Sequence, residues 1–198
     1  MSKLLRNSQV KIIEAIYRNP GINLRGIIEE TRLSPNYVSQ YVNTLVEKKV
    51  LHEKRFTKKK VYLRTFILNI HEDLTKTLLA LVQEAKKETF FEKYPKLQPI
   101  LKQISEVEGI EFLIIYGSYA RLTAEKDSDL DVLIVGKIKN VDKIREILIS
   151  LDMEPSIKIE TLADFKKRMN DDIHRQIVKE GIIQYGVNNF LEIISEKQ

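Results

Sequence analysis

Residues 110–135 read IEFLIIYGSYARLTAEKDSDLDVLIV, and they contain two apolar runs separated by a polar loop. The first run, 110–116, is rich in β-branched and aromatic residues and ends at Gly117, which is typical of a buried strand that enters a turn. The second run is an apolar strand that begins with two carboxylates, Asp129 and Asp131. We therefore expect two strands that are joined by a short helical stretch and a loop.

The two carboxylates at the start of the second strand suggest a metal site. Strand side chains alternate, so Asp129 and Asp131 are expected on one face. Two carboxylates that converge repel each other unless a cation lies between them, and oxygen ligands of this kind suit Mg²⁺ or Mn²⁺. Gly117 permits close backbone approach to a phosphate, and Ser118 offers a hydroxyl and an N–H at a helix start. The sequence therefore predicts a site for a divalent cation and a phosphate group.

The residues Gly-Ser-Tyr-Ala-Arg at 117–121, followed by Ser-Asp-Leu-Asp at 128–131, resemble the signature of the DNA polymerase β-like nucleotidyltransferase superfamily. Within it, they are most similar to the minimal nucleotidyltransferases, over roughly residues 95–187. The resemblance implies an α+β fold with a mixed sheet flanked by helices. It also implies metal-dependent transfer of a nucleoside monophosphate from an NTP, with Mg²⁺ or Mn²⁺ ions that orient the triphosphate.

The resemblance assigns roles to individual residues. Asp129 and Asp131 would bind the metal ions, and Gly117 and Ser118 would hold phosphates of the nucleotide. Arg121 is either a phosphate contact or a residue that fixes the loop.

Members of the superfamily have a third carboxylate on a later strand, which is expected here over residues 156–161. Ile157 and Ile159 are expected to face the core, which leaves Glu160 as the only carboxylate on the opposite face. The resemblance therefore implies that Glu160 is the third metal ligand and a catalytic group. The alternative is a surface glutamate, because the superfamily usually has an aspartate in the middle of this strand.

The N-terminal third of the chain is basic. Residues 1–65 carry 14 Lys and Arg against five Asp and Glu, while the whole chain has a net charge of +5. Helical periodicity predicts helices over 7–18, 24–31 and 35–48, followed by two strands on either side of a basic hairpin tip, 56–60. This order resembles the winged helix-turn-helix domains of transcription regulators. We therefore expect double-stranded DNA as a partner; a small helical domain for protein contacts is the alternative.

In such modules the third helix enters the major groove and the hairpin contacts the neighbouring phosphates. Short polar side chains on the helix suit base edges or phosphates, and basic side chains supply the attraction that is independent of sequence. The expected DNA-binding residues are Asn36, Tyr37, Ser39, Gln40 and Asn43 on the helix, with Lys54, Arg55, Lys58, Lys59 and Lys60 in the hairpin.

These patterns predict a winged helix over 1–66, a linking helix over 67–94 and a nucleotidyltransferase domain over 95–198. The linking helix has an apolar stripe that suits either a bridge or the seam of a homodimer. The chain has no cysteine, which excludes disulfides, thiolate metal sites and cysteine nucleophiles, and its three histidines leave little material for a histidine metal site. No apolar run reaches the roughly 18 residues that a membrane span needs, so the cytoplasm is the expected location.

The leading expectation is an enzyme that transfers a nucleotide to an acceptor, either a protein or a nucleic acid. One alternative is a DNA-binding regulator that senses nucleotide without turnover. Another is an antitoxin-type protein that attaches nucleotides to a partner protein. The sequence specifies neither the acceptor nor the NTP.

Overall fold

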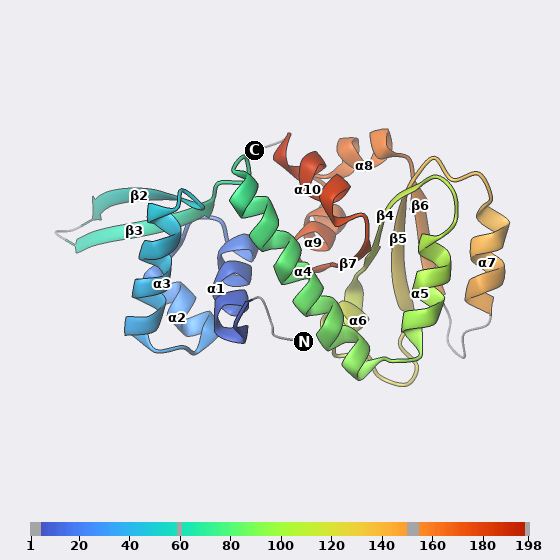
Figure 1. Cartoon of the computed structure of the whole chain (residues 1–198), viewed down its shortest axis with the longest axis horizontal. Helices are drawn as coiled ribbons and strands as arrows, with labels where there is room; N and C mark the ends of the chain where they lie inside the picture. The colour runs from blue at the N-terminus through green and yellow to red at the C-terminus, as the bar shows by residue number, and fades with distance from the viewer. Residues whose placement is uncertain (1–4, 59–60, 150–154, 197–198) are drawn as a thin grey trace. The chain divides into compact units, whose positions relative to one another are not determined.

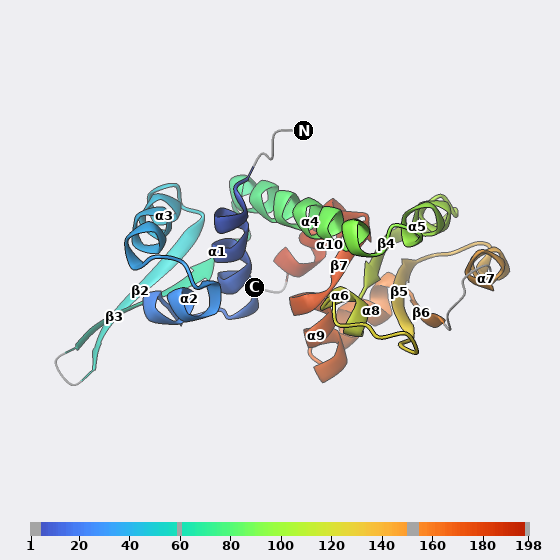
Figure 2. The same ribbon diagram turned by 90° about the horizontal axis from the view of Figure 1, so that it is seen from below.

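The computed structural model describes residues 5–58, 61–149 and 155–196. The chain forms two compact units, one ending at Val82 and the other beginning at Gln83 (Figure 1, Figure 2). The change of unit falls inside the long helix α4, Asp73–Lys93. The domain limits expected from the sequence, 1–66, 67–94 and 95–198, stay a prediction.

The first unit has the helices and the hairpin of a winged helix-turn-helix. Its elements are α1 Asn7–Arg18, β1 Ile22–Asn23, α2 Leu24–Thr31, α3 Pro35–Glu47, β2 Leu51–Lys58 and β3 Val61–Leu68. The strands form an antiparallel sheet in the order β1-β3-β2. The sequence does not predict β1, because two residues are too few to show an alternating pattern.

Side-chain caps fix the starts of α2 and α3. The Asn23 side-chain oxygen accepts a hydrogen bond from the Gly26 N–H at 2.8 Å, and Ser34 Oγ accepts one from the Tyr37 N–H at 3.4 Å. Each cap satisfies an N–H that has no partner inside its helix. Both starts agree with the sequence expectation. The helices enclose a core of fully buried side chains, among them Ile12, Ile13, Ile16, Ile27, Val38 and Val42.

The second unit is built on a mixed four-stranded sheet, which confirms the expected α+β class. Its elements after α4 are α5 Leu97–Ser105, β4 Ile110–Ile115, α6 Gly117–Ala120, β5 Leu130–Gly136, α7 Val141–Ile149, β6 Pro155–Glu160, α8 Leu162–Arg168, α9 Asp172–Glu180, β7 Ile182–Tyr185 and α10 Val187–Ser195. The strand order is β6-β5-β4-β7, in which β5 and β6 are parallel and the other pairs are antiparallel.

Helices cover both faces of this sheet, with α5 and α7 on one side and α8, α9 and α10 on the other (Figure 1). On the α5 side, buried residues of the strands and helices pack into one cluster that includes Leu101, Leu113, Val132, Ile134 and Ile144. On the other side, the Phe112 ring lies 5.0 Å from that of Phe165 and 5.6 Å from that of Phe190. Since both faces are covered, β5 is apolar along nearly its whole length.

Among the described residues, no helix has both the length and the apolar character that crossing a membrane requires.

Candidate active site

Three neighbouring strands place Tyr116, Asp131 and Ser156 in one row across a single face of the sheet. The register of β5 and β6 pairs Asp131 with Ser156, and the Tyr116 N–H donates a hydrogen bond to the Asp131 carbonyl at 3.1 Å. The Ser156 hydroxyl acts on both the Asp131 carboxylate and the Tyr116 hydroxyl and lowers the pKa of each. We call these three residues the site row. Asp129 lies two residues before Asp131, just before β5 begins, and its negative charge acts on the Asp131 carboxylate.

The turn after β4 lies directly against the Asp131 carboxylate. Gly117 has φ +68°, and a Cβ at this position would lie 2.0 Å from Asp131 Oδ2. No other residue type leaves room for the carboxylate there, and the left-handed conformation also favours glycine. Gly117 therefore brings the backbone of the turn and the carboxylate into close approach, as the sequence motif suggested.

Four charged or polar side chains act on the Asp131 carboxylate. Burial raises the pKa of Asp131, and the negative charge of Asp129 adds to this effect. The hydrogen bond from Ser156 and the positive charges of Arg121 and Lys158 lower the pKa of Asp131, but they do not cancel the rise. Asp131 is half-buried and Asp129 is exposed, and the pair of carboxylates is short of positive charge. A divalent cation with hard oxygen ligands, such as Mg²⁺, fits Asp129 and Asp131.

The structure does not bring Glu160 to this pair. The register pairs Asp131 with Ser156, Leu133 with Lys158 and Val135 with Glu160, so Glu160 lies two rows beyond the site row. Four residues of strand amount to roughly 13 Å. Among the described residues, no group of three or more His, Asp or Glu side chains could hold a metal ion.

Glu160 is instead a buried residue with two partners of its own. It is only 5% exposed, its Oε1 accepts a hydrogen bond from Arg168 Nη1 at 3.0 Å, and its Oε2 lies 2.9 Å from His174 Nε2. Helices α8 and α9, which carry these partners, cover the sheet face that the sequence reasoning took to be open. The expected role of Glu160 as third ligand is therefore corrected. Likewise Ile159, which was expected in the core, is 37% exposed.

Comparisons with known proteins agree with the two units. A family model described as "Polymerase beta, Nucleotidyltransferase" matches residues 96–189, and one described as "Winged helix-turn-helix DNA-binding" matches residues 5–51. A protein of Methanocaldococcus jannaschii named "Putative protein adenylyltransferase" is 31% identical over 80 residues, which cover 38% of this chain and 79% of that protein. The chain belongs to the polymerase β-type nucleotidyltransferase family. It carries a winged helix-turn-helix in addition.

The remaining residues of the nucleotidyltransferase motif lie in and after α6. The Ser118 carbonyl accepts a hydrogen bond from the Thr123 N–H at 2.9 Å, which closes the turn. Arg121 Nη1 lies 3.5 Å from a carboxylate oxygen of Glu180 in α9, and 44% of its side chain is exposed. Its charge also acts on Asp131. Arg121 thus both ties the loop to α9 and remains near the carboxylates, so the geometry accommodates both roles left open by the sequence.

Three residues near the carboxylates were not assigned roles from the sequence. Tyr116 and Ser156 join the site through strand register, which the sequence does not encode in a recognisable pattern. Lys158 was recognisable, because alternation already placed it on the same strand face as Glu160. Among these, Tyr116 has a raised pKa because of burial and the nearby charges of Asp131 and Glu160.

In the winged helix of the nucleotidyltransferase, some of the expected DNA-binding residues are exposed to solvent, and others form hydrogen bonds or ion pairs within the unit. Asn36, Gln40 and Lys54 are exposed, and Ser39 is half-buried. Asn43 accepts a hydrogen bond from Arg64 of β3 at 2.8 Å, and the Tyr37 hydroxyl lies 2.8 Å from Ser8 Oγ. Among the basic residues expected in the hairpin, Arg55 forms an ion pair with Glu53 at 2.9 Å. Lys58 is the last residue of β2, and Lys59 and Lys60 lie outside the described residues.

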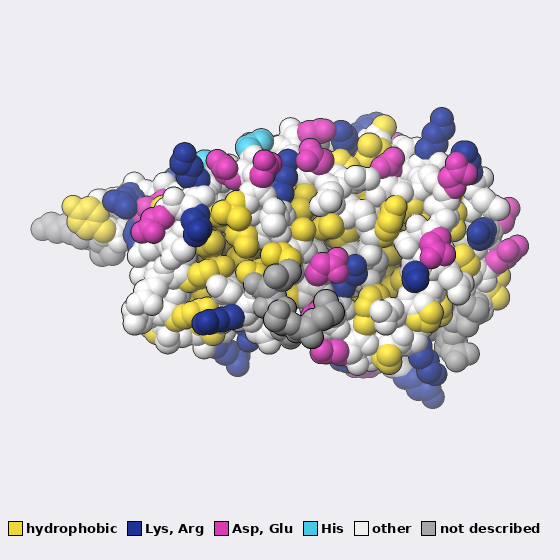
Figure 3. All heavy atoms as spheres, viewed as in Figure 1, with side chains coloured by type: hydrophobic (Ala, Val, Ile, Leu, Met, Phe, Trp, Pro, Cys, Tyr) yellow, Lys and Arg dark blue, Asp and Glu magenta, His cyan; other side chains and the backbone are white. Residues whose placement is uncertain are grey.

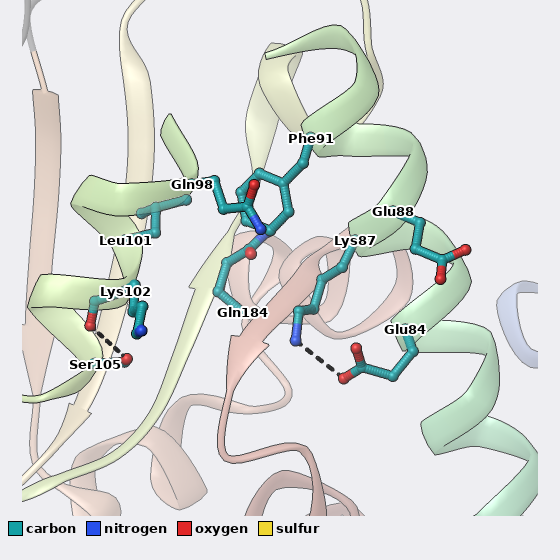
Figure 4. Close-up of a pocket in the computed structure, with 9 residues that line it drawn as sticks. All are labelled: Glu84, Lys87, Glu88, Phe91, Gln98, Leu101, Lys102, Ser105 and Gln184. Carbon is teal, nitrogen blue, oxygen red and sulfur yellow. Dashed lines mark hydrogen bonds and ion pairs between the residues drawn. The ribbon is translucent and has the colours of Figure 1, made fainter. Parts of the chain in front are cut away.

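The nucleotidyltransferase unit also has a separate cavity of about 380 Å³ between α4, α5 and β7 (Figure 4). Phe91, Gln98 and Leu101 line it, and Gln184 projects into it from β7. Both polar atoms of the Gln184 amide are buried and have no hydrogen-bond partner among the described residues. No residue of the site row lines this cavity, so we do not assign it to the metal or the phosphates.

Gly117→Ala tests the close approach at the site. We expect the added methyl group to displace the Asp131 carboxylate and to weaken binding of Mn²⁺ with a non-hydrolysable ATP analogue by about tenfold or more, or about 1.4 kcal/mol. Calorimetry measures this. Gly21→Ala is the control, because Gly21 also has a positive φ, of +87°, but nothing lies within 4 Å of its added Cβ. Equal binding by both variants would contradict the site.

Glu160→Gln separates a structural role from a ligand role. We expect the variant to lose about 2 kcal/mol of unfolding free energy, because charged hydrogen bonds to Arg168 and His174 weaken, and to keep its affinity for Mn²⁺. Denaturant unfolding and calorimetry measure the two quantities. The control is Glu108→Gln, whose partner Lys139 forms an exposed ion pair at 2.5 Å and should contribute little. A loss of metal affinity at unchanged stability would restore the ligand role.

Proposed function

We propose that this protein is a metal-dependent nucleotidyltransferase that moves AMP from ATP to a hydroxyl group of a partner protein, and that its winged helix binds double-stranded DNA. The placement of Asp131 against the glycine turn at Gly117, with the charge of Asp129 acting on the same carboxylate, carries the proposal. The name of the Methanocaldococcus protein supports ATP as donor and a protein as acceptor.

The reaction class sets what the residues must do. The acceptor hydroxyl loses its proton to solvent as its oxygen attacks the α-phosphorus, the bond from that phosphorus to the bridging oxygen breaks, and pyrophosphate leaves. Asp129 and Asp131 would hold Mg²⁺, which neutralises phosphate charge and orients the triphosphate. The Ser156 hydroxyl acts on the Asp131 carboxylate and lowers its pKa. The turn at Gly117 lies directly against that carboxylate, so a phosphate bound at the turn would lie beside the metal ligands, and Arg121 supplies positive charge nearby.

The DNA-binding part of the proposal rests on the winged helix. Asn36 and Gln40 are exposed on α3, the helix that enters the major groove in such modules. The face of the molecule seen in Figure 3 has basic and acidic side chains interspersed, and the described residues form no extended basic patch there. The attraction to DNA would then depend on the hairpin and on the other faces of this unit.

Transfer of label tests the enzyme. The full chain is incubated with Mg²⁺ or Mn²⁺, a cell lysate and ATP that is labelled at either the α- or the γ-phosphate. We expect label from the α-phosphate alone to appear on a protein, and Asp131→Asn to lower the rate at least about 100-fold, which corresponds to about 2.7 kcal/mol. Asp127→Asn is the matched control, because Asp127 is an exposed carboxylate of the preceding loop. Label from the γ-phosphate would indicate a kinase instead.

A second candidate is a DNA-binding regulator that binds nucleotide without turnover. The observation in its favour is that β6 brings no carboxylate to the site row. This candidate predicts that ATP with Mg²⁺ binds and changes the affinity for DNA, while no protein or nucleic acid becomes labelled. The labelling experiment and a DNA titration with and without ATP therefore distinguish the two functions.

The wing should contribute to DNA binding through charge. Because each lysine that neutralises a phosphate releases a counterion, changing Lys58, Lys59 and Lys60 to Ala should lower the slope of log K against log salt by up to about three units. Fluorescence anisotropy of the full chain with duplex DNA at several salt concentrations measures the slope. The same charge change at three exposed lysines of the other unit, Lys126, Lys137 and Lys143, is the control. An unchanged slope in the wing variant would remove the wing from the interface.

A further inference from the structure

The row next to the site row presents a lysine to the carboxylates. Lys158 pairs with Leu133 in the register of β5 and β6, so it lies on the same sheet face as Asp131 and Ser156 and one row further along. Lys158 is half-buried. Within the described part of the chain, no carboxylate lies within ion-pair distance of its ammonium group.

The Lys158 charge acts on the site. A displacement of two residues along a strand is roughly 6.6 Å, which the four-carbon side chain of a lysine can span. The register of the two strands and the length of the side chain therefore place the Lys158 ammonium within reach of the Asp131 carboxylate.

The donors at the site suffice for one divalent cation. Mg²⁺ and Mn²⁺ need oxygen ligands, and the protein oxygens available are those of Asp129 and Asp131. A second ion beside Asp131 would need a further carboxylate from β6. The β6 residue in the site row is Ser156, which has a hydroxyl and no carboxylate. The next position on that face carries the Lys158 ammonium, which repels a cation, and Glu160 is buried between Arg168 and His174.

We propose that this site takes one divalent cation per bound nucleotide, held by Asp129 and Asp131, and that the Lys158 ammonium stands in place of a second cation and contacts a phosphate of the nucleotide. The inference rests on one part of the proposed function, which is that the site binds a nucleotide together with a metal ion. Lys158 would then contact the substrate directly. Its ammonium group would supply a fixed positive charge at the position where a second metal ion would otherwise bind.

Counting ions tests this inference without turnover. The full chain is saturated with an ATP analogue that has a methylene bridge between the α- and β-phosphates, and bound Mn²⁺ is counted by EPR of the free ion. The wild-type chain should bind one Mn²⁺ per bound nucleotide. Lys158→Asp, which supplies a carboxylate, should bind two. Lys167→Asp is the matched control, because Lys167 is exposed on α8, and it should remain at one.

A second variant tests the phosphate contact. Lys158→Met keeps the length of the side chain without the charge, and it should weaken binding of the analogue by about tenfold while Lys158→Arg restores most of the affinity. Unchanged affinity in Lys158→Met would overturn the contact.

The count on the wild-type chain decides the main point even where a variant fails to fold. Two Mn²⁺ ions per nucleotide on the wild type would overturn the inference and leave the proposed function intact. No binding of the analogue at all would overturn both. One ion on a folded Lys158→Asp variant would show that Lys158 does not occupy the place of the second ion.

Discussion

The site depends on the close approach between the Gly117 backbone and the Asp131 carboxylate. A Cβ at Gly117 would lie 2.0 Å from Asp131 Oδ2, so the absence of a side chain there is a condition for the position of the carboxylate. Ser156 lies opposite Asp131 in the register of β5 and β6 and acts on the same carboxylate. The site therefore requires that β5 and β6 stay in the register that pairs Asp131 with Ser156, and that the turn at Gly117 stays beside Asp131. The apolar packing on both faces of the sheet supplies that register.

The sheet face that carries the site changes character over three rows. The first row is polar, with Tyr116, Asp131 and Ser156. The third row is buried under α8, α9 and α10, where the Phe112 ring packs and Glu160 finds Arg168 and His174. A buried carboxylate needs such partners, because its desolvation is costly. Glu160 therefore contributes to the packing of these helices, and the polar chemistry is confined to the end of the sheet where β5 and β6 begin.

Local patterns were sufficient to predict most of the fold and the close approach of the Gly117 turn to the strand that carries Asp131. Periodicity predicts the helices of the first unit, and the glycine turn with its aspartate pair predicts the two central strands and the carboxylates of the site. The assignment of Glu160 failed because alternation shows which residues share a face but not whether helices cover it. Ser156 and Tyr116 could not be assigned, because their roles depend on the pairing of strands far apart in sequence. Helices α7 and α10 show apolar spacing, around Ile144 and Phe190, that the sequence reasoning left unused.

The placement of the charges near Asp131 bears on what the nucleotide must bring with it. Arg121 and Lys158 are covalently part of the chain, so their positive charge at the carboxylates does not depend on the concentration of free metal. A triphosphate that binds in such a site replaces some of its solution counterions with the side chains of Arg121 and Lys158. These side chains are already oriented, so binding requires little reorganisation of the protein. In the proposed site the carboxylate pair would bind one divalent cation, because Arg121 is shared with Glu180 and the pKa of Asp131 remains raised. One ion and two fixed cations would then offset the charge of a bound triphosphate. In the proposed transfer, the acceptor hydroxyl would find no carboxylate of β6 in the site row to activate it.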